Sequence, residues 1–316
     1  MVKKDNILND EEKALLNIFS IKFRGRTKYD YNREITAFKL FVKKDILDVH
    51  SEDAINYIDM LIKDEQKSSS TKQRIYYQLL SFYNFLSERK LIETNPFWKV
   101  EKPQASKQIK KERTPTFEQI EKLFNVLAGH FSLRDLALVS VIATTGLRIS
   151  EVLNLKWSDF LIDAKDNIGF KVQQGEHFRY IRVLNSVWNL LNKYRKEFLN
   201  VNDSYLKQPF YVFINANQLN NYITSPEGVR PLTQAAVRNL LVDACNKAGI
   251  PVFTSKDLRH AHAIFALKLG ANVEEVKEQL NWSSTNLIYR YNGVMEQIET
   301  PANVYTEKFF EGIIKV

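Results

Sequence analysis

The stretch TGLRISEVLNLKW (145–157) joins two helical patterns in the middle of this 316-residue chain. The run before it, LRDLALVSVIATTG (133–146), predicts a helix that ends at Gly146, because glycine commonly closes a helix. The next helix is predicted to begin near Ser150. Arg148 lies between the two helices, so we expect its side chain to project from a turn that packing holds on both sides.

Outward from this stretch, residues 114–316 predict a domain of helices with one pair of strands. The segment IGFKVQQGEHFRYIRVL (168–184) predicts two short strands around a turn at Gly175, because β-branched and aromatic residues flank the glycine. The tail TEKFFEGIIKV (306–316) is expected to be helical, as either the last core helix or an apolar arm. Other helical patterns lie at 117–129, 186–199, 233–249, 256–270 and 271–282. The predicted fold class is therefore α+β, mainly helical.

The first hundred residues carry apolar side chains at helical spacing, which predicts a bundle of about four short helices. We expect this helical domain at 10–100, with its end near Asn95 and Pro96. Residues 101–113 are polar and predict a linker to the second domain at 114–316. The linker carries five Lys/Arg and two Glu, so it is either a solvated linker or a basic strap laid along phosphates.

The composition limits the classes of protein that fit the chain. A formal net charge of +8 is compatible with a polyanionic partner such as DNA. The single cysteine, Cys245, excludes an internal disulfide and a cysteine-rich zinc site, and it fits a reducing, cytoplasmic setting. No apolar run is long enough to span a bilayer, so we expect no membrane partner.

Three segments carry candidate chemistry: TGLRISEVLNLKW, KDLRHAHAIFALKLG (256–270) and LNWSSTNLIYRY (280–291). Each has an ordinary interpretation when taken singly, as a surface arginine, a helix histidine or a core tyrosine. A metal site is disfavoured because the histidines lack HExxH spacing and have no nearby cysteine. A serine hydrolase is disfavoured because no GxSxG turn is present, and no Walker A sequence indicates a nucleotide. We therefore expect neither a metal nor a cofactor.

Together, the three segments resemble the tyrosine recombinase family, which includes phage integrases, the Xer recombinases and Cre. TGLRISEVLNL is similar to the family's Gly-Leu-Arg-x-x-Glu run, which implies that Arg148 is the first catalytic arginine and Glu151 a supporting acid. The family's His-x-x-Arg-His run corresponds to residues 256–260 and implies Arg259 as the second arginine.

The third segment carries the implied nucleophile. Leu280-Asn281-Trp282 resembles the family's Leu-Gly-His/Trp segment, and Trp282 would donate a hydrogen bond to a phosphate oxygen. The family's nucleophilic tyrosine lies nine residues further on, which is Tyr291, with Tyr289 as the rival. The resemblance therefore implies attack of a tyrosine on double-stranded DNA and a covalent 3′-phosphotyrosyl intermediate.

The resemblance covers nearly the whole chain and also implies how it would act. The helical domain at 10–100 resembles the family's core-binding domain, and 114–316 resembles its catalytic domain. The two would close as a clamp around a duplex, and four protomers would assemble on DNA as a homotetramer. Two guanidiniums suit the developing negative charge on the phosphate better than two lysines, because they are planar, bidentate and always charged.

Two residues depart from the family pattern at the proton donor. Lys256 stands where the family has histidine, and Gln174 aligns with the family's hairpin lysine, which glutamine cannot replace as an acid. We hypothesise that Lys256 supplies the proton, with Lys171 and His177 as the competing candidates. These departures keep two alternatives open: a catalytically weak DNA-binding or architectural relative, and a type IB topoisomerase-like enzyme.

Overall fold

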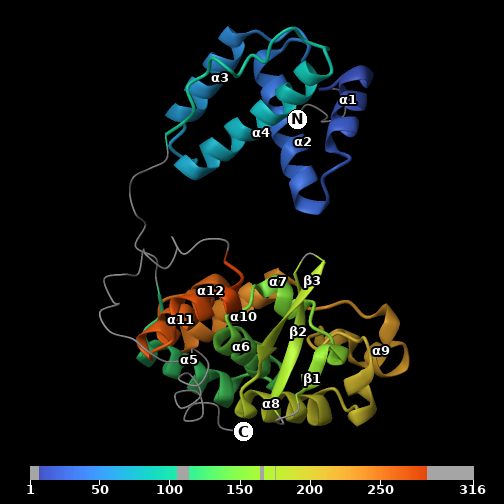
Figure 1. Ribbon diagram of the computed structural model, residues 1–316, viewed down its shortest axis with the longest axis vertical. Coiled ribbons are helices and arrows are strands. Elements are labelled where there is room, and N and C mark those ends of the chain that lie inside the picture. Colours follow the sequence, from blue (N-terminus) through green and yellow to red (C-terminus); the bar gives the residue numbers. More distant parts are fainter. Residues whose placement is uncertain (1–6, 105–113, 164–166, 175, 283–316) are drawn as a thin grey trace. The chain divides into compact units, whose positions relative to one another are not determined.

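The computed structural model describes residues 7–104, 114–163, 167–174 and 176–282 (Figure 1). The chain divides into two compact units, residues 1–110 and 111–316. This boundary lies inside 101–113, and the role of that segment on DNA stays a prediction. None of the helices in the described ranges is both long and apolar enough to cross a membrane.

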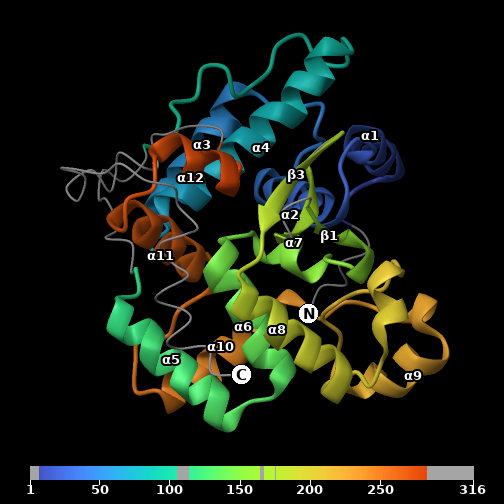
Figure 2. The ribbon, with the colours of Figure 1, turned by 60° about the horizontal axis from the view of Figure 1, so that its bottom comes forward.

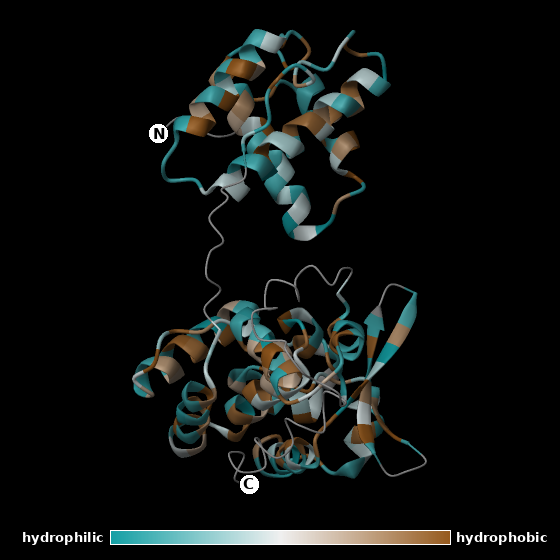
Figure 3. Ribbon diagram, turned by 60° about the vertical axis from the view of Figure 1, so that its left-hand side comes forward, coloured by the Kyte–Doolittle hydropathy of each residue, from teal (hydrophilic) through white to brown (hydrophobic). Residues whose placement is uncertain are grey.

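The first unit is a bundle of helices around an aromatic core. Its helices are α1 (Asp10–Ser20), α2 (Gly25–Val42), α3 (Ser51–Lys63) and α4 (Ser69–Glu88). In Figure 3 apolar and polar residues alternate along them, as expected of helices with one buried stripe. The buried rings of Phe19, Phe38, Phe82 and Phe97 meet their neighbours largely edge to face, a favoured geometry for aromatic pairs. The predicted helical bundle is confirmed.

The second unit is mixed, and its elements follow the predicted order. Its helices are α5 (Phe117–His130), α6 (Leu133–Thr145), α7 (Ile149–Leu153), α8 (Asn185–Lys193), α9 (Leu219–Thr224), α10 (Gln234–Lys247), α11 (Ser255–Lys268) and α12 (Val273–Leu280). A π-helical turn, Tyr194–Phe198, continues α8. The strands are β1 (Phe160–Ile162), β2 (Ile168–Gln174) and β3 (His177–Arg182). The α+β, mainly helical class is confirmed.

Helix α6 is the central helix of the second unit (Figure 2). Every residue from Asp135 to Thr145 is buried, as expected of a helix that is apolar on all sides. It packs against α5, α8 and α11, so its C-terminal end is fixed from several directions. Cys245 is buried on α10, within the helix predicted at 233–249.

A three-stranded antiparallel sheet lies beside this helical core in the order β1-β2-β3. The β2–β3 hairpin confirms the predicted pair of strands, with Lys171 opposite Tyr180 and Val172 opposite Arg179. Strand β1 was not predicted, because three residues are too few to show an alternating pattern. On β3, Arg179 and Ile181 face inward, while Phe178 and Tyr180 are exposed.

Candidate active site

The turn between α6 and α7 carries the first predicted arginine. Gly146 closes α6 with φ +63°, a left-handed conformation that favours glycine. A Cβ atom at this position would lie 2.5 Å from Leu280 Cδ2 and 2.7 Å from His262 Cδ2. The turn therefore requires glycine for its conformation and for the close approach of α11 and α12. Arg148 follows as the N-cap of α7, one residue before the helix begins.

Glu151 orients Arg148 from within the first turn of α7. Its Oε2 accepts a hydrogen bond from the Arg148 backbone N–H at 2.7 Å, and its Oε1 lies 3.2 Å from Arg148 Nη1. The carboxylate is mostly buried, whereas the Arg148 side chain is 45% exposed. One face of this guanidinium is thus held by the protein and the other remains open to solvent.

The second predicted arginine, Arg259, is buried on α11 next to the same turn. Its Nη1 donates to the carbonyl of Gly146 at 2.6 Å, and its Nη2 donates to the carbonyl of Leu280. Burial and then the charge of Arg148 lower the pKa of Arg259 to about 10, so it stays protonated at neutral pH. The structure brings together two residues that lie 111 positions apart in the sequence.

A third arginine, Arg179, joins them from β3. Its Nη2 lies 2.7 Å from Glu151 Oε1, and its Nη1 donates to the carbonyl of Gln279. The sequence analysis did not single out Arg179, because no motif marks it. Apolar residues on both faces of the strand also leave its inward orientation undecided. The carboxylate of Glu151 is therefore shared by two arginines.

The C-terminal end of α12 receives all three guanidiniums. The carbonyls of three successive residues, Gln279, Leu280 and Asn281, accept from Arg179, Arg259 and Arg148, the last at 3.0 Å. The last carbonyls of a helix have no partner inside it and carry the negative end of its dipole. Asn281 ends α12 in a left-handed conformation, φ +49°. Cationic side chains at this end are electrostatically favoured.

Gln279 and His262 support this arrangement from the inside. The side-chain amide of Gln279 donates to the carbonyl of Thr145 at 3.2 Å and lies 3.0 Å from His262 Nε2. Burial lowers the pKa of His262 to about 4, so this histidine is neutral near pH 7 and acts as a hydrogen-bonding core residue. It therefore joins α11 and α12 to the end of α6. The described residues hold no histidine, cysteine or carboxylate cluster suited to a metal ion.

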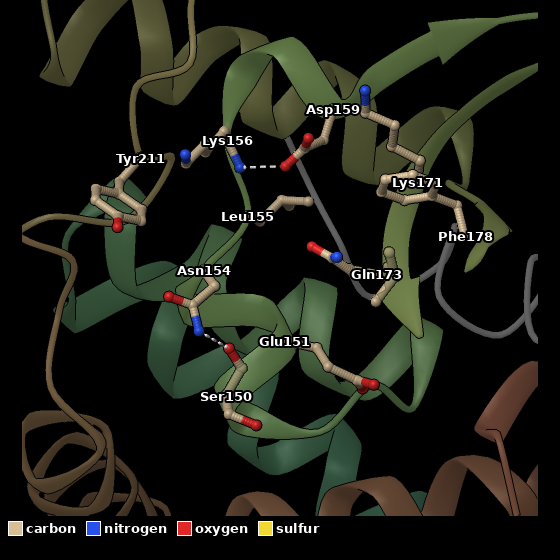
Figure 4. Close-up of a pocket in the computed structure, with 11 residues that line it drawn as sticks. Ser150, Glu151, Asn154, Leu155, Lys156, Asp159, Lys171, Gln173, Phe178 and Tyr211 are labelled. Carbon is tan, nitrogen blue, oxygen red and sulfur yellow. Dashed lines mark hydrogen bonds between the residues drawn. The ribbon is translucent and has the colours of Figure 1, made fainter. Parts of the chain in front are cut away.

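A pocket of about 440 Å³ lies beside α7 and the hairpin (Figure 4). Lys171 borders it from β2, with its Nζ 5.6 Å from the Phe178 ring centre. Glu151 borders it from α7, so the pocket and the arginines share a carboxylate. Its other lining residues include Ser150, Asn154, Lys156, Asp159, Gln173 and Tyr211. Lys171, a candidate proton donor, thus lines the same pocket as Glu151.

The phage integrase family matches this chain over residues 113–297, more than half of its length. The chain belongs to the phage integrase family. Among curated relatives of this tyrosine recombinase, tyrosine recombinase XerC of Staphylococcus carnosus (strain TM300) is 27% identical over 302 residues, covering 92% of this chain and 94% of the relative. XerC of Pediococcus pentosaceus (strain ATCC 25745 / CCUG 21536 / LMG 10740 / 183-1w) is 26% identical over 288 residues, covering 87% and 90%.

Solved structures of recombinases share the fold. The XerH site-specific recombinase bound to palindromic difH substrate, in its post-cleavage complex, matches with a TM-score of 0.66 and 18% identity, covering 84% of this chain and 76% of that one. A lambda integrase (75-356) dimer bound to a COC′ core site matches with a TM-score of 0.66 and 17% identity, covering 91% and 98%. At these identities the likeness concerns the fold alone.

The other predicted site residues of this recombinase lie in different settings. Trp282 is half-buried, with its ring centre 6.0 Å from Arg259 Cζ. Lys256 is exposed in the first turn of α11, three residues before Arg259. Gln174 ends β2, where its backbone pairs with His177. Tyr291 and its rival Tyr289 lie outside the described residues, as does the tail 306–316, so their assignments stay predictions.

Proposed function

We propose that this recombinase cleaves and rejoins DNA at a specific site through a 3′-phosphotyrosyl intermediate, with Tyr291 as nucleophile. The observation that carries the proposal is the meeting of Arg148 and Arg259 at the end of α12. The segment that contains Tyr291 begins directly after that helix in the sequence. The two cations thus meet at the helix end from which the segment with Tyr291 continues in the sequence.

The proposed reaction conserves the energy of the phosphodiester bond. The Tyr291 hydroxyl gives up its proton to solvent as its oxygen attacks the scissile phosphorus, a P–O bond to tyrosine forms, and the bond to the 5′-oxygen breaks. The 5′-oxygen leaves as a hydroxyl after it takes a proton, and a 5′-hydroxyl later reverses the step on the exchanged strand. Arg148 and Arg259 stabilise charge on the non-bridging oxygens, where one fixed donor is typically worth on the order of 10²–10³ in rate.

Lys256 is our candidate for the proton donor. Trp282 and Gln174 are our candidates for hydrogen-bond donors to the phosphate. Lys256 lies three residues before Arg259, and side chains at this spacing share a helix face. Lys171 is the competing donor, since it borders the pocket that also contains Glu151. His177, exposed on the hairpin, is the third candidate.

The proposal extends to DNA binding and assembly. The helical domain at 10–100 would contact DNA, the basic segment 101–113 would lie along phosphates, and four copies would act together. Lambda integrase has been solved as a tetramer bound to a Holliday junction, with a TM-score of 0.61, which supports this arrangement for the shared fold. A mobile-element origin and a cytoplasmic setting stay predictions. The relatives are named recombinases, so the architectural and topoisomerase-like alternatives are not favoured.

Covalent capture tests the proposal. The full chain is incubated with overlapping duplexes from the DNA on either side of its gene, and adducts that survive denaturing detergent are collected. We expect one short duplex to give a protein–DNA adduct whose digestion leaves a nucleotide on Tyr291. Strand transfer between two labelled copies of that duplex would distinguish recombination from relaxation. Absence of any adduct across the flanking DNA, with binding intact, would contradict the proposed function.

A further inference from the structure

Arg179 is the guanidinium that the proposed reaction does not yet use. Its side chain is 10% exposed, so it is not presented to a substrate as Arg148 is. It nevertheless contacts both parts of the site: the carboxylate that orients Arg148 and the α12 carbonyl next to the one that holds Arg259. A buried cation with two such contacts is fixed in place.

The position of Glu151 explains why a third cation is needed. The carboxylate is required to orient the backbone and side chain of Arg148. Its negative charge also lies next to the guanidinium of Arg148, which in the proposed reaction binds a phosphate. With Arg148 and Glu151 alone, the two charges would cancel. Arg179 lies closer to Glu151 Oε1, at 2.7 Å, than Arg148 does, at 3.2 Å.

We infer that Arg179 is a positioning residue of the reaction, which offsets the charge of Glu151 so that Arg148 and Arg259 both act on the scissile phosphate. Glu151 can then orient Arg148 without neutralising it. Through the Gln279 carbonyl, Arg179 also holds the end of α12 in register with the hairpin. This inference rests on the proposed function, since it concerns the same phosphate.

The register of β3 makes a matched control available. Arg182 lies on the same strand, carries the same charge and is exposed on the opposite face from Arg179. Replacing it removes one positive charge from the hairpin without touching Glu151 or Gln279. Any loss that comes only from the net charge of the hairpin will therefore occur equally in both variants.

The experiment compares Arg179→Gln, Arg179→Lys and Arg182→Gln in the full chain. The probe is a nicked derivative of the duplex captured above, and the readout is the single-turnover rate of adduct formation at saturating protein. We expect Arg179→Gln to lower this rate by about 10- to 100-fold, since misplaced or weakened supporting groups cost this much. Arg179→Lys should lower the rate less, because lysine keeps the positive charge but lacks the two parallel N–H donors of a guanidinium. Arg182→Gln should stay within about threefold of the unaltered protein, with DNA affinity measured separately.

Adding Glu151→Gln to Arg179→Gln separates charge balance from a merely structural role. In the double variant Arg148 and Arg259 again face no negative charge from residue 151. We therefore expect it to be at least about tenfold faster than Arg179→Gln alone, so that the second substitution offsets the first, as contacting residues can do. A further loss in the double variant, or an Arg179→Gln rate equal to that of the unaltered protein, would overturn the inference. If the unaltered protein forms no adduct, the proposed function itself fails, which is a different outcome.

Discussion

The three arginines of the site and its two candidate lysines are held in different ways. Arg148, Arg179 and Arg259 each donate to a main-chain carbonyl at the end of α12. Lys256 is exposed in the first turn of α11, and Lys171 is half-buried on the hairpin beside the ring of Phe178. Charge stabilisation acts best from donors that need no reorganisation. A proton donor needs only to reach one oxygen, so a long side chain near the site suffices.

Substitution of the proposed nucleophile should have the largest effect on cleavage. Tyr291→Phe removes the oxygen that we propose attacks the phosphate, so adduct formation on the captured duplex should disappear while DNA binding persists. Tyr289→Phe is the matched control and should still form the adduct. The assignment is wrong if Tyr291→Phe is trapped and Tyr289→Phe is not.

Loss of an arginine should be the next largest effect. We expect Arg148→Ala to slow cleavage on the order of 10³-fold with little change in affinity, because the contact strengthens mainly in the transition state. Arg259→Ala should slow cleavage as much and should also cost about 1–3 kcal/mol of folding stability, since it removes the side chain that donates to the buried carbonyls of Gly146 and Leu280. Rates come from single-turnover assays and stabilities from urea unfolding. Parallel loss of binding, folding and cleavage in Arg148→Ala would indicate a structural role instead.

The lysines should have smaller effects that a modified substrate can separate. Lys256→Ala is expected to slow cleavage by about 10²-fold, the low end for a general acid, because Lys171 can partly replace it. A 5′-bridging phosphorothiolate carries a sulfur that leaves without a proton, so Lys256→Ala should recover on it. Recovery of Lys171→Ala, with Lys256→Ala slow on both substrates, would instead make Lys256 a phosphate contact.

The crowding at Gly146, in the turn that precedes Arg148, can be tested by measuring the free energy of unfolding. Gly146→Ala should destabilise the fold by about 2–4 kcal/mol, since it adds a close contact with Leu280 and His262 to a left-handed backbone. Gly249→Ala is the matched control: its φ is +64°, and no atom lies within 4 Å of the added Cβ. It should cost only about 1–2 kcal/mol. Equal losses in urea unfolding would show that crowding at Gly146 contributes nothing.

His262 predicts a pH dependence of stability. Its pKa is about 4 in the folded protein against an ordinary 6.5. Between these values only the unfolded chain takes up the proton, so stability falls as the pH drops from about 6.5 to 4 and this contribution is then flat. We expect the unaltered protein to lose about 3 kcal/mol more than His262→Gln between pH 7 and pH 4 in urea unfolding. Equal losses in the two proteins would contradict a neutral, buried His262.

The sequence was informative wherever a pattern is local. Helix periodicity located most helices of both units but not the short α9, the glycine pattern located the end of α6, and β-branched and aromatic residues located the β2–β3 hairpin. The sequence did not predict strand β1, because its three residues become a strand only by pairing with 168–170. The sequence did not predict Arg179 as a site residue, because a shift of one residue in strand register decides whether its side chain faces the core or solvent.

What the sequence by itself determined is the family, and its short motifs predicted Arg148 and Arg259 as site residues. Only the tertiary structure decided that these arginines meet, that Arg179 joins them, and that one carboxylate serves two of them. The physical reason is that unpaired carbonyls at a helix end become a binding site only when packing brings distant donors to them. Here α12 is that end, and the donors come from the start of α7, from β3 and from α11.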